Sequence, residues 1–344
     1  MVQPATVIPA GWAATCSLFT VKKFCISMPR NQTSIGPGAK PSAIEPPPES
    51  PAGVACAVGA FLIWGLTPIY FKTLRAIPAI EILMHRMVWS FLFLLPFVVF
   101  TNRRSEFRSV IFSARTMLIL LATTLLVSSN WFVFIWAINS DRILQTSLGY
   151  YINPLINVLL GVVFLKERLR PVQLAAVILA AVGVVYLTVE IGRPPWIALF
   201  LAFTFGFYGL IRKVAAVNAL VGLTIETLLL SLPAVVYLGT LYVHGSGAFL
   251  RIDGRTDILM MCAALVTAVP LLLFTIGARR IHFSTLGILQ YIAPSCTFLL
   301  AVFVYREPFR AAQLWTFMLI WTALLLYSID SVVYFRRHHS PRRR

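Results

Sequence analysis

From Val54 onward, the sequence is dominated by apolar stretches that recur at lengths of about 20 residues, which is what a helix needs to cross a bilayer. In hydrocarbon every backbone N–H and C=O group must be paired internally, so only helices and closed barrels can span a membrane. These stretches are continuous rather than alternating, which excludes a barrel. The sequence therefore predicts an all-α integral membrane protein. We expect ten spanning helices, at residues 54–71, 80–100, 117–138, 144–165, 171–189, 195–211, 221–243, 257–277, 284–304 and 311–334.

The composition supports lipid as the solvent for much of the chain. Only 12% of the 344 residues are charged and 59% are hydrophobic, whereas a soluble domain carries roughly a quarter charged residues. The formal net charge of +17 would suggest nucleic acid in a soluble protein. No basic stretch is interleaved with aromatic residues in the way that single-strand binders need, and the five cysteines are scattered without a ligand-like spacing. We therefore expect no nucleic-acid partner, no metal, no cofactor and no disulfide.

The chain is expected to divide into two halves with a tail at each end. Residues 1–52 are rich in Pro, Ser, Gly and Thr, and such a segment cannot bury enough apolar surface to order itself. We interpret them as a disordered cytoplasmic extension, or as the product of a start site upstream of the true one. A first five-helix half is expected at 53–190, a second at 191–335, and a basic cytoplasmic tail at 336–344.

The positive charges indicate an orientation, because cytoplasmic loops carry an excess of Lys and Arg. With both termini in the cytoplasm, most of the 29 Lys and Arg residues fall on the inner side. Much of that excess lies in the two tails. We expect a multi-pass protein of the cell (inner) membrane with cytoplasmic termini, and attraction of these arginines to the anionic leaflet explains the high net charge.

An internal duplication with an offset of 140 residues is the most informative feature. The string Tyr151-Ile152-Asn153-Pro154 matches Tyr291-Ile292-Ala293-Pro294, and ten of the 25 positions in 150–174 are identical to their counterparts in 290–314. If each half holds five spans, an odd number, the second half enters the membrane in the opposite sense. Inverted repeats allow a central site to face first one side and then the other. The duplication therefore predicts a permease that works by alternating access.

Six strings of the sequence carry a family signature: LIWGLTPIY at 62–70, EILMHR at 81–86, NW at 130–131, SLGYYINP at 147–154, LKERL at 165–169 and QYIAP at 290–294. They resemble RarD-like proteins of the EamA family, in the drug/metabolite transporter superfamily. The resemblance covers about residues 53–335 and implies ten spans, two EamA-like halves and a transport role, without defining a substrate. The chain departs from the family pattern in its long N-terminal extension and in the arginine at Arg306.

Ionisable groups inside a span cost roughly 2.5–3.5 kcal/mol on insertion scales, so each of them suggests a function. Glu81 and His85 lie four residues apart on one helical face, with Arg86 beside them. One interpretation is a gate or an anion-sensitive site in which His85 changes charge near physiological pH. The other is that Glu81 pairs with Arg86, or with a loop arginine, at the membrane edge. Glu226 is the second-half counterpart, but it lacks neighbouring His or Arg partners, because Thr227-Leu228-Leu229 follow it.

Further candidates for a substrate pathway are amides, prolines and aromatic residues. Asn153 and Gln290 offer amides at mid-span depth, and Pro154 and Pro294 can each open a backbone carbonyl to a cavity. Proline-interrupted spans at matching positions indicate a central binding site, although interhelical hydrogen bonding would also explain the amides. The remaining candidates are Trp64, Pro68, Asn130, Trp131, Tyr150, Tyr151 and Tyr291.

Three functions compete. A permease or exporter of small metabolites or amphipathic compounds explains the repeat, the paired prolines and the sparse charges. A non-transporting assembly partner gives no reason for paired prolines at mid-membrane depth, and an integral membrane enzyme needs a catalytic constellation that no motif of this sequence supplies. We expect no enzyme activity, no nucleotide-binding domain, and a small-molecule substrate and the lipid bilayer as partners. The substrate, the direction of transport, ion coupling and the oligomeric state do not follow from the sequence.

Overall fold

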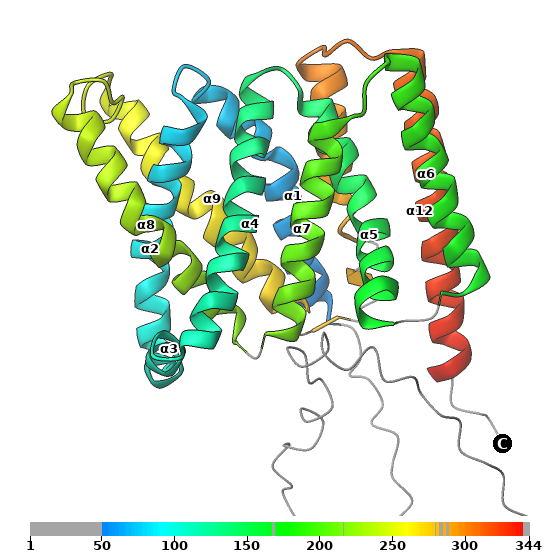
Figure 1. Ribbon diagram of the computed structural model, residues 1–344, viewed down its shortest axis with the longest axis horizontal. Helices are drawn as coiled ribbons and strands as arrows, with labels where there is room; N and C mark the ends of the chain where they lie inside the picture. Colours follow the sequence, from blue (N-terminus) through cyan, green and yellow to red (C-terminus); the bar gives the residue numbers. More distant parts are fainter. Residues whose placement is uncertain are drawn as a thin grey trace, which may run out of the picture. The chain divides into compact units, whose positions relative to one another are not determined.

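The computed structural model describes residues 50–166, 169–215, 217–278, 280–281, 285–286 and 289–339. The expected N-terminal extension, residues 1–52, therefore lies outside the described residues except for residues 50–52. The described part of the chain consists of helices joined by short connections (Figure 1). The last helix continues to His339, so it includes the beginning of the expected basic tail, and residues 340–344 lie outside the described residues.

The helices coincide with the segments that hydropathy selected. Up to residue 191 they are α1 (Pro51–Thr73), α2 (Ala79–Phe100), α3 (Arg104–Ile111), α4 (Ala114–Asn139), α5 (Ile143–Leu165) and α6 (Pro171–Ile191). From residue 196 they are α7 (Trp196–Val214), α8 (Ala219–Val243), α9 (Gly254–Ala278), α11 (Ile292–Leu299), the π-helix η2 (Leu300–Val304) and α12 (Ala311–His339). The short helix α3 was not expected, because its charged sequence lies between the expected spans 80–100 and 117–138.

Among the described residues, eight helices are long and apolar enough to cross a membrane: α1, α2, α4, α5, α6, α8, α9 and α12. Two other apolar helices are shorter, at Trp196–Arg212 and Ile292–Val304. At 1.5 Å per residue the second of these extends about 20 Å, less than the ~30 Å hydrocarbon core. Large apolar side chains such as Leu118, Leu232 and Phe303 are 60–70% exposed, as expected of surfaces in contact with lipid. The prediction of an all-helical membrane protein is confirmed.

Local sequence signals explain where several helices begin and end. Pro171 is the first residue of α6, a position at which a missing N–H costs no hydrogen bond. The helix ends at Gly192, whose φ of 73° is in the left-handed region that glycine tolerates. Ser113 and Asn218 are the N-cap residues just before α4 and α8, and their side-chain oxygens accept hydrogen bonds from Thr116 N–H and Leu220 N–H.

The packing of the helices relates the two parts of the chain. Helix α1 packs against α9 and α11, while α7 packs against α4 and α5. Helix α2 contacts α8 and α9, and α8 in turn contacts α4. Helices α6 and α12 lie side by side and run in opposite directions (Figure 1). The apolar helices of the two parts correspond in order: α1 to α7, α2 to α8, α4 to α9, α5 to α11 and α6 to α12. When each helix is replaced by its counterpart, every packed pair above becomes another packed pair or stays the same.

Glycines allow the closest of these approaches. A Cβ added to Gly65 of α1 would lie 2.6 Å from the Cβ of Cys296 and 2.9 Å from the carbonyl oxygen of Ala293, both on α11. At the corresponding place on α7, a Cβ added to Gly206 would lie 3.0 Å from Cγ2 of Ile156 on α5. Helices in membranes associate through such small residues, because lipid provides no hydrophobic driving force between them.

We predict that Gly65→Val destabilises the protein, because the added side chain would collide with the backbone of α11. Overpacking of this kind costs about 1–3 kcal/mol, and thermal unfolding of the purified protein in detergent would measure the loss. Gly239→Val on α8 is the matched control, since nothing lies within 4 Å of a Cβ built at Gly239. Equal unfolding midpoints for the two variants would contradict the close contact between α1 and α11.

Candidate functional site

The beginning of α2 carries a buried carboxylate that holds a distant connection. Glu81 is only 2% exposed, and its Oε1 accepts a hydrogen bond of 2.6 Å from the N–H of Ala248. Ala248 belongs to the connection between α8 and α9, residues 244–253. One turn further along α2, the ring of His85 lies 4.8 Å from the ring of Phe249, measured between centroids. We name these four residues the α2 latch, because they hold the α8–α9 connection against the start of α2.

The beginning of α8 is covered in a corresponding way by the connection between α2 and α4, residues 101–113. Glu106 on α3 accepts a hydrogen bond of 2.9 Å from the N–H of Asn218, which begins α8. Beside it, Val110 packs in an apolar cluster with Val221 and Ile225 of α8. We name Glu106 and Asn218 the α8 latch. Each part of the chain thus places one connection against the start of a helix in the other part.

Glu226, the counterpart of Glu81, is also 2% exposed but has different partners. Its carboxylate accepts hydrogen bonds from the hydroxyls of Thr123 at 2.6 Å and Tyr208 at 3.2 Å, and it lies 3.8 Å from Nε of Arg212. The cation that sequence neighbours did not supply therefore comes from α7. Gly222 leaves room for it, because a Cβ there would collide with the guanidinium of Arg212.

Arg86 lies deeper along α2 and is 7% exposed. Its Nε donates a hydrogen bond of 2.7 Å to Oγ1 of Thr267 on α9. Its Cζ lies 4.3 Å from the ring centroid of Trp131 on α4 and 5.8 Å from that of Phe71 on α1. Arg86 forms no ion pair with a carboxylate in the described part of the chain. Glu81 instead bonds to the α8–α9 connection, so the expected alternative, an ion pair between Glu81 and Arg86, is not formed.

Asn130 links two helices. It is fully buried, and its Nδ2 donates hydrogen bonds of 2.9 Å to the carbonyl oxygen of Leu201 and to Oγ1 of Thr204, both on α7. The hydroxyl of Tyr150 on α5 lies 3.5 Å from Oδ1 of Asn130. The amide is therefore used in packing α4, α5 and α7 together, an arrangement that the sequence had left open.

The two prolines of the duplicated string occupy different positions in their helices. Pro154 lies inside α5, where its missing N–H removes an intrahelical hydrogen bond. Pro294 lies in the first turn of α11, where that N–H would have no intrahelical partner. Its carbonyl oxygen accepts a hydrogen bond of 2.9 Å from Oγ of Ser147, which joins α11 to α5. Asn153 is buried beside Pro154, and its Oδ1 has no hydrogen-bond partner among the described residues.

Three other candidates lie apart from these groups. The ring of Trp64 packs against Phe61 and Phe274, at centroid distances of 5.7 and 5.8 Å, in a separate apolar cluster. Pro68 is buried within α1. Gln290 is partly buried in the turn that precedes α11. The structure therefore does not bring all of the candidate residues into one site.

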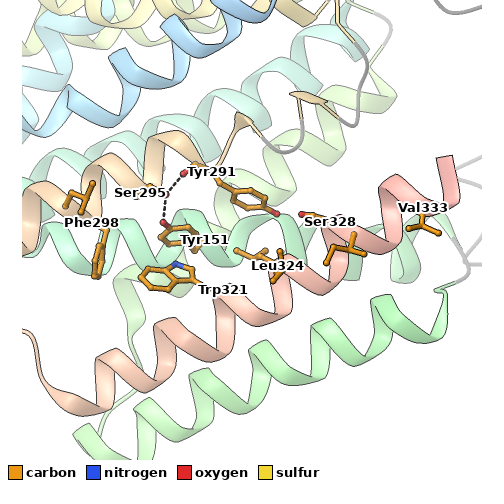
Figure 2. Close-up of a pocket in the computed structure, with 11 residues that line it drawn as sticks. Tyr151, Tyr291, Ser295, Phe298, Trp321, Leu324, Ser328 and Val333 are labelled. Atoms are coloured by element: carbon orange, nitrogen blue, oxygen red, sulfur yellow. Dashed lines mark hydrogen bonds between the residues drawn. The ribbon is translucent and has the colours of Figure 1, made fainter. Parts of the chain in front are cut away.

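Tyr151 and Tyr291 line a cavity of about 670 Å³ between α5, α11 and α12 (Figure 2). Their rings are stacked, with centroids 6.5 Å apart, and the Tyr151 hydroxyl is 2.6 Å from Oγ of Ser295. Apart from Ser328, the other lining residues are apolar: Phe298, Leu299, Trp321, Leu324, Leu325, Ile329 and Val333. Because Leu299 and Leu325 are more than half exposed, this cavity reaches the apolar surface. Neighbouring tyrosines thus diverge, since Tyr150 faces Asn130 and Tyr151 faces the cavity.

Glu307 is a structural residue that sequence reasoning did not select. Its two carboxylate oxygens accept hydrogen bonds of 2.6 and 2.8 Å from the N–H groups of Ile143 and Leu144, the first residues of α5. Burial raises the pKa of the Glu307 carboxyl, while the two N–H groups act in the opposite direction. The available signal was the duplication, in which Glu307 matches Glu167, a residue outside the described residues.

The buried carboxylates are not arranged for metal binding. Glu81, Glu226 and Glu307 stand at the beginnings of different helices or in separate connections, and each accepts hydrogen bonds from the protein. Within the described part of the chain, no three His, Cys, Asp or Glu side chains are grouped closely enough to hold a metal ion.

The sequence of this chain is similar to a family of transporters and to several known bacterial proteins. Residues 51–189 match the model of the EamA-like transporter family. An "Uncharacterized transporter" of Vibrio cholerae is 46% identical, covering 85% of this chain and 95% of the relative. "Uncharacterized transporter YojE" of Bacillus subtilis is 43% identical over 85% of this chain and 98% of its own length. "Protein RarD" of Escherichia coli is 42% identical, over 83% of this chain and 96% of its own length.

A solved crystal structure shares the fold. It has a TM-score of 0.53 and 18% sequence identity, and the match covers 81% of this chain and 97% of the other. At that identity the similarity concerns the arrangement of helices and says nothing about what is bound.

We predict that Glu81→Gln loosens the α2 latch, because a neutral amide is a weaker acceptor than a carboxylate. In a cysteine-free background, Ala248→Cys is buried, so its modification by a maleimide reports opening of the α8–α9 connection. The Gln variant should raise that rate roughly five- to tenfold, because a hydrogen bond to a neutral group contributes about 1 kcal/mol less than one to a charged group. Glu190→Gln, an exposed position on α6, is the control, and equal rates in all three backgrounds would contradict the latch.

Proposed function

The chain belongs to the EamA-like transporter family, and on that premise we propose that it moves a small organic solute across the cell membrane by alternating access. Its relatives are transporters, and the chain is a multi-pass membrane transporter of unknown substrate. The single observation that supports alternating access is the pairwise exchange of helix neighbours between the two parts of the chain. When two equivalent halves pack against each other, each can adopt the conformation of the other. The protein then has two states of similar energy that open the site to opposite sides.

We propose that the two halves are inverted repeats of five spans, residues 53–190 and 191–335. Several helix pairs support this interpretation: α1 with α11 corresponds to α7 with α5, and α1 with α9 corresponds to α7 with α4. Gly65 and Gly206 occupy equivalent positions in the first of these pairs. The opposite directions of α6 and α12 in Figure 1 also fit an inverted relation. In this proposal the short helices α7 and α11–η2 complete the count of ten.

The two latches are the proposed gates. If the halves are inverted, the starts of α2 and α8 lie on opposite sides of the membrane, and so do the connections held against them. Opening the α2 latch while the α8 latch stays closed would expose the interior to one side, and the reverse would expose it to the other. Movable connections at opposite ends of a rigid bundle are a known means of gating.

The remaining features of the proposal concern topology and energy. Both termini are placed in the cytoplasm, as the distribution of Lys and Arg favours. Residues 1–52 are proposed as an extension without a role in the transport path, and a monomer is the proposed functional unit. We propose transport without catalysis and without direct use of ATP, so that an ion gradient or the solute's own gradient supplies the energy.

Transport by the purified protein in proteoliposomes tests this function. A thermal-stability screen against amino acids, nucleobases and amphipathic drugs would select solutes for the flux measurement. We expect saturable exchange of at least one solute class. Absence of saturable flux for every solute that stabilises the folded protein would contradict the proposal.

We predict that Glu81→Gln and Glu106→Gln each slow this exchange several-fold, because alternating access requires each gate to close in turn. The exposed Glu190→Gln variant should exchange at the wild-type rate. If both latch variants also exchange at the wild-type rate while folded, the two connections do not act as gates.

A further inference from the structure

Arg86 is a buried cation for which the described residues supply no counter-ion. It lies seven residues after the start of α2, about 10 Å along the helix axis. A charged side chain at such depth in a membrane protein is costly and is ordinarily paired. Phe71, Trp131 and Thr267, which contact its guanidinium, are uncharged. The phenols of Tyr70 and Tyr150 also lie close enough to interact with its charge. The missing negative charge is the first observation that points to a ligand.

The geometry of the guanidinium leaves its best donors free. Its face stacks over Trp131 at 4.3 Å, and Nε donates to Thr267. Stacking occupies the face of the planar group and leaves the in-plane N–H groups available. The two terminal nitrogens of Arg86 make no hydrogen bond to a described residue. Together they form the fork that matches the two oxygens of a carboxylate.

A second, independent observation lies on the same helix. The hydroxyl of Ser90, one turn beyond Arg86, is fully buried and has no hydrogen-bond partner among the described residues. The same is true of the buried Nε2 of His85 and Nε1 of Trp89. Buried polar atoms are nearly always hydrogen-bonded. The rings of His85 and Trp89 both pack against Phe249, whereas Ser90 lies four residues after Arg86 and so on the same face of α2. The unpartnered Ser90 hydroxyl near the Arg86 guanidinium indicates that a bound molecule or water completes this site.

We propose that Arg86 binds the carboxylate of a small organic monoanion whose remaining part is apolar or aromatic. This proposal rests on the proposed transport function and names the class of its substrate. One guanidinium among uncharged neighbours balances a single negative charge, which favours a carboxylate over a doubly charged phosphate ester. The aromatic rings of Phe71 and Trp131 suit an apolar body, and Ser90 supplies a hydrogen-bonding group one turn away.

The α2 latch controls access to this site. Glu81 and His85 precede Arg86 on the same helix, and the connection that they hold covers the start of α2. An anion reaching Arg86 from that side must pass the latched connection. The site therefore lies behind one of the two proposed gates, as a transported substrate requires.

The test compares acids with their uncharged amides at constant shape. Purified wild-type protein is exposed to benzoate and benzamide, phenylacetate and phenylacetamide, indole-3-acetate and indole-3-acetamide, with phenyl phosphate and benzylamine as further charge states. Thermal stabilisation measures binding, and counterflow in proteoliposomes measures transport. We expect at least one acid to bind and exchange, with an affinity tenfold or more above that of its amide, because hydrogen bonds to charged groups are the stronger ones.

Variants assign that preference to Arg86. Arg86→Gln should lower the affinity for the preferred acid at least tenfold and leave the affinity for its amide unchanged. Arg86→Lys retains the charge without the fork and should fall between the two. The exposed Arg115→Gln at the start of α4 is the matched control. If Arg86→Gln does not fold, the acid–amide comparison in the wild type and the Lys variant still decide the matter.

The outcomes separate this proposal from the function on which it rests. Equal affinity for acids and amides, binding of no acid, or undiminished acid binding by Arg86→Gln would each overturn the anion site. If only neutral or cationic solutes are exchanged, no acid is exchanged, and the wild type and Arg86→Gln exchange them equally, transport stands and the anion site fails. If the folded wild type exchanges no solute of any charge, the transport function itself fails.

Discussion

Lipid cannot hydrogen-bond to a polar group, so a polar side chain buried among the helices needs a partner within the protein. Glu81 and Glu106 accept from backbone N–H groups of other connections, Glu307 accepts from the start of α5, and Glu226 draws its partners from α4 and α7. Each of these contacts joins elements that are distant in the sequence. The polar groups that need partners within the protein therefore also join distant helices and connections. Arg86 stands out because no carboxylate of the described residues pairs with its charge.

Close packing complements these polar contacts. Gly65 allows α1 to approach α11 closely, and Gly206 allows α7 to approach α5, so these helix pairs are held by backbone proximity. Side chains at these points would separate the halves. The connections that close over α2 and α8 are held by single hydrogen bonds and small apolar contacts, which are weaker. Gating requires this combination of closely packed helices and connections that are held weakly enough to open.

Hydropathy located the spanning helices because the 20-residue apolar runs are a local property, and the duplicated string was visible because Pro, Glu and Gln recur at fixed spacing. Local sequence could not reveal the partner of Glu81, which is 167 residues away, or Arg212, which approaches Glu226 from another helix.

Helix α3 was missed because its charged sequence resembles a loop. Pro294 was expected to interrupt a span, but the helix begins at Ile292 and tolerates it. The candidate aromatic residues do not share one site: Trp64 packs in a separate cluster, and the adjacent residues Tyr150 and Tyr151 of α5 face different neighbours.

The central claim is that residues 191–335 repeat residues 53–190 in the opposite sense. In a cysteine-free background, Ala76→Cys reports the connection between α1 and α2, and Ala219→Cys, at the first residue of α8, reports the corresponding end of α8. Labelling of intact cells with a membrane-impermeant maleimide, before and after permeabilisation, measures on which side each cysteine lies. An inverted arrangement predicts that Ala76→Cys is labelled from outside and Ala219→Cys only after permeabilisation. Labelling of both from the same side would contradict it.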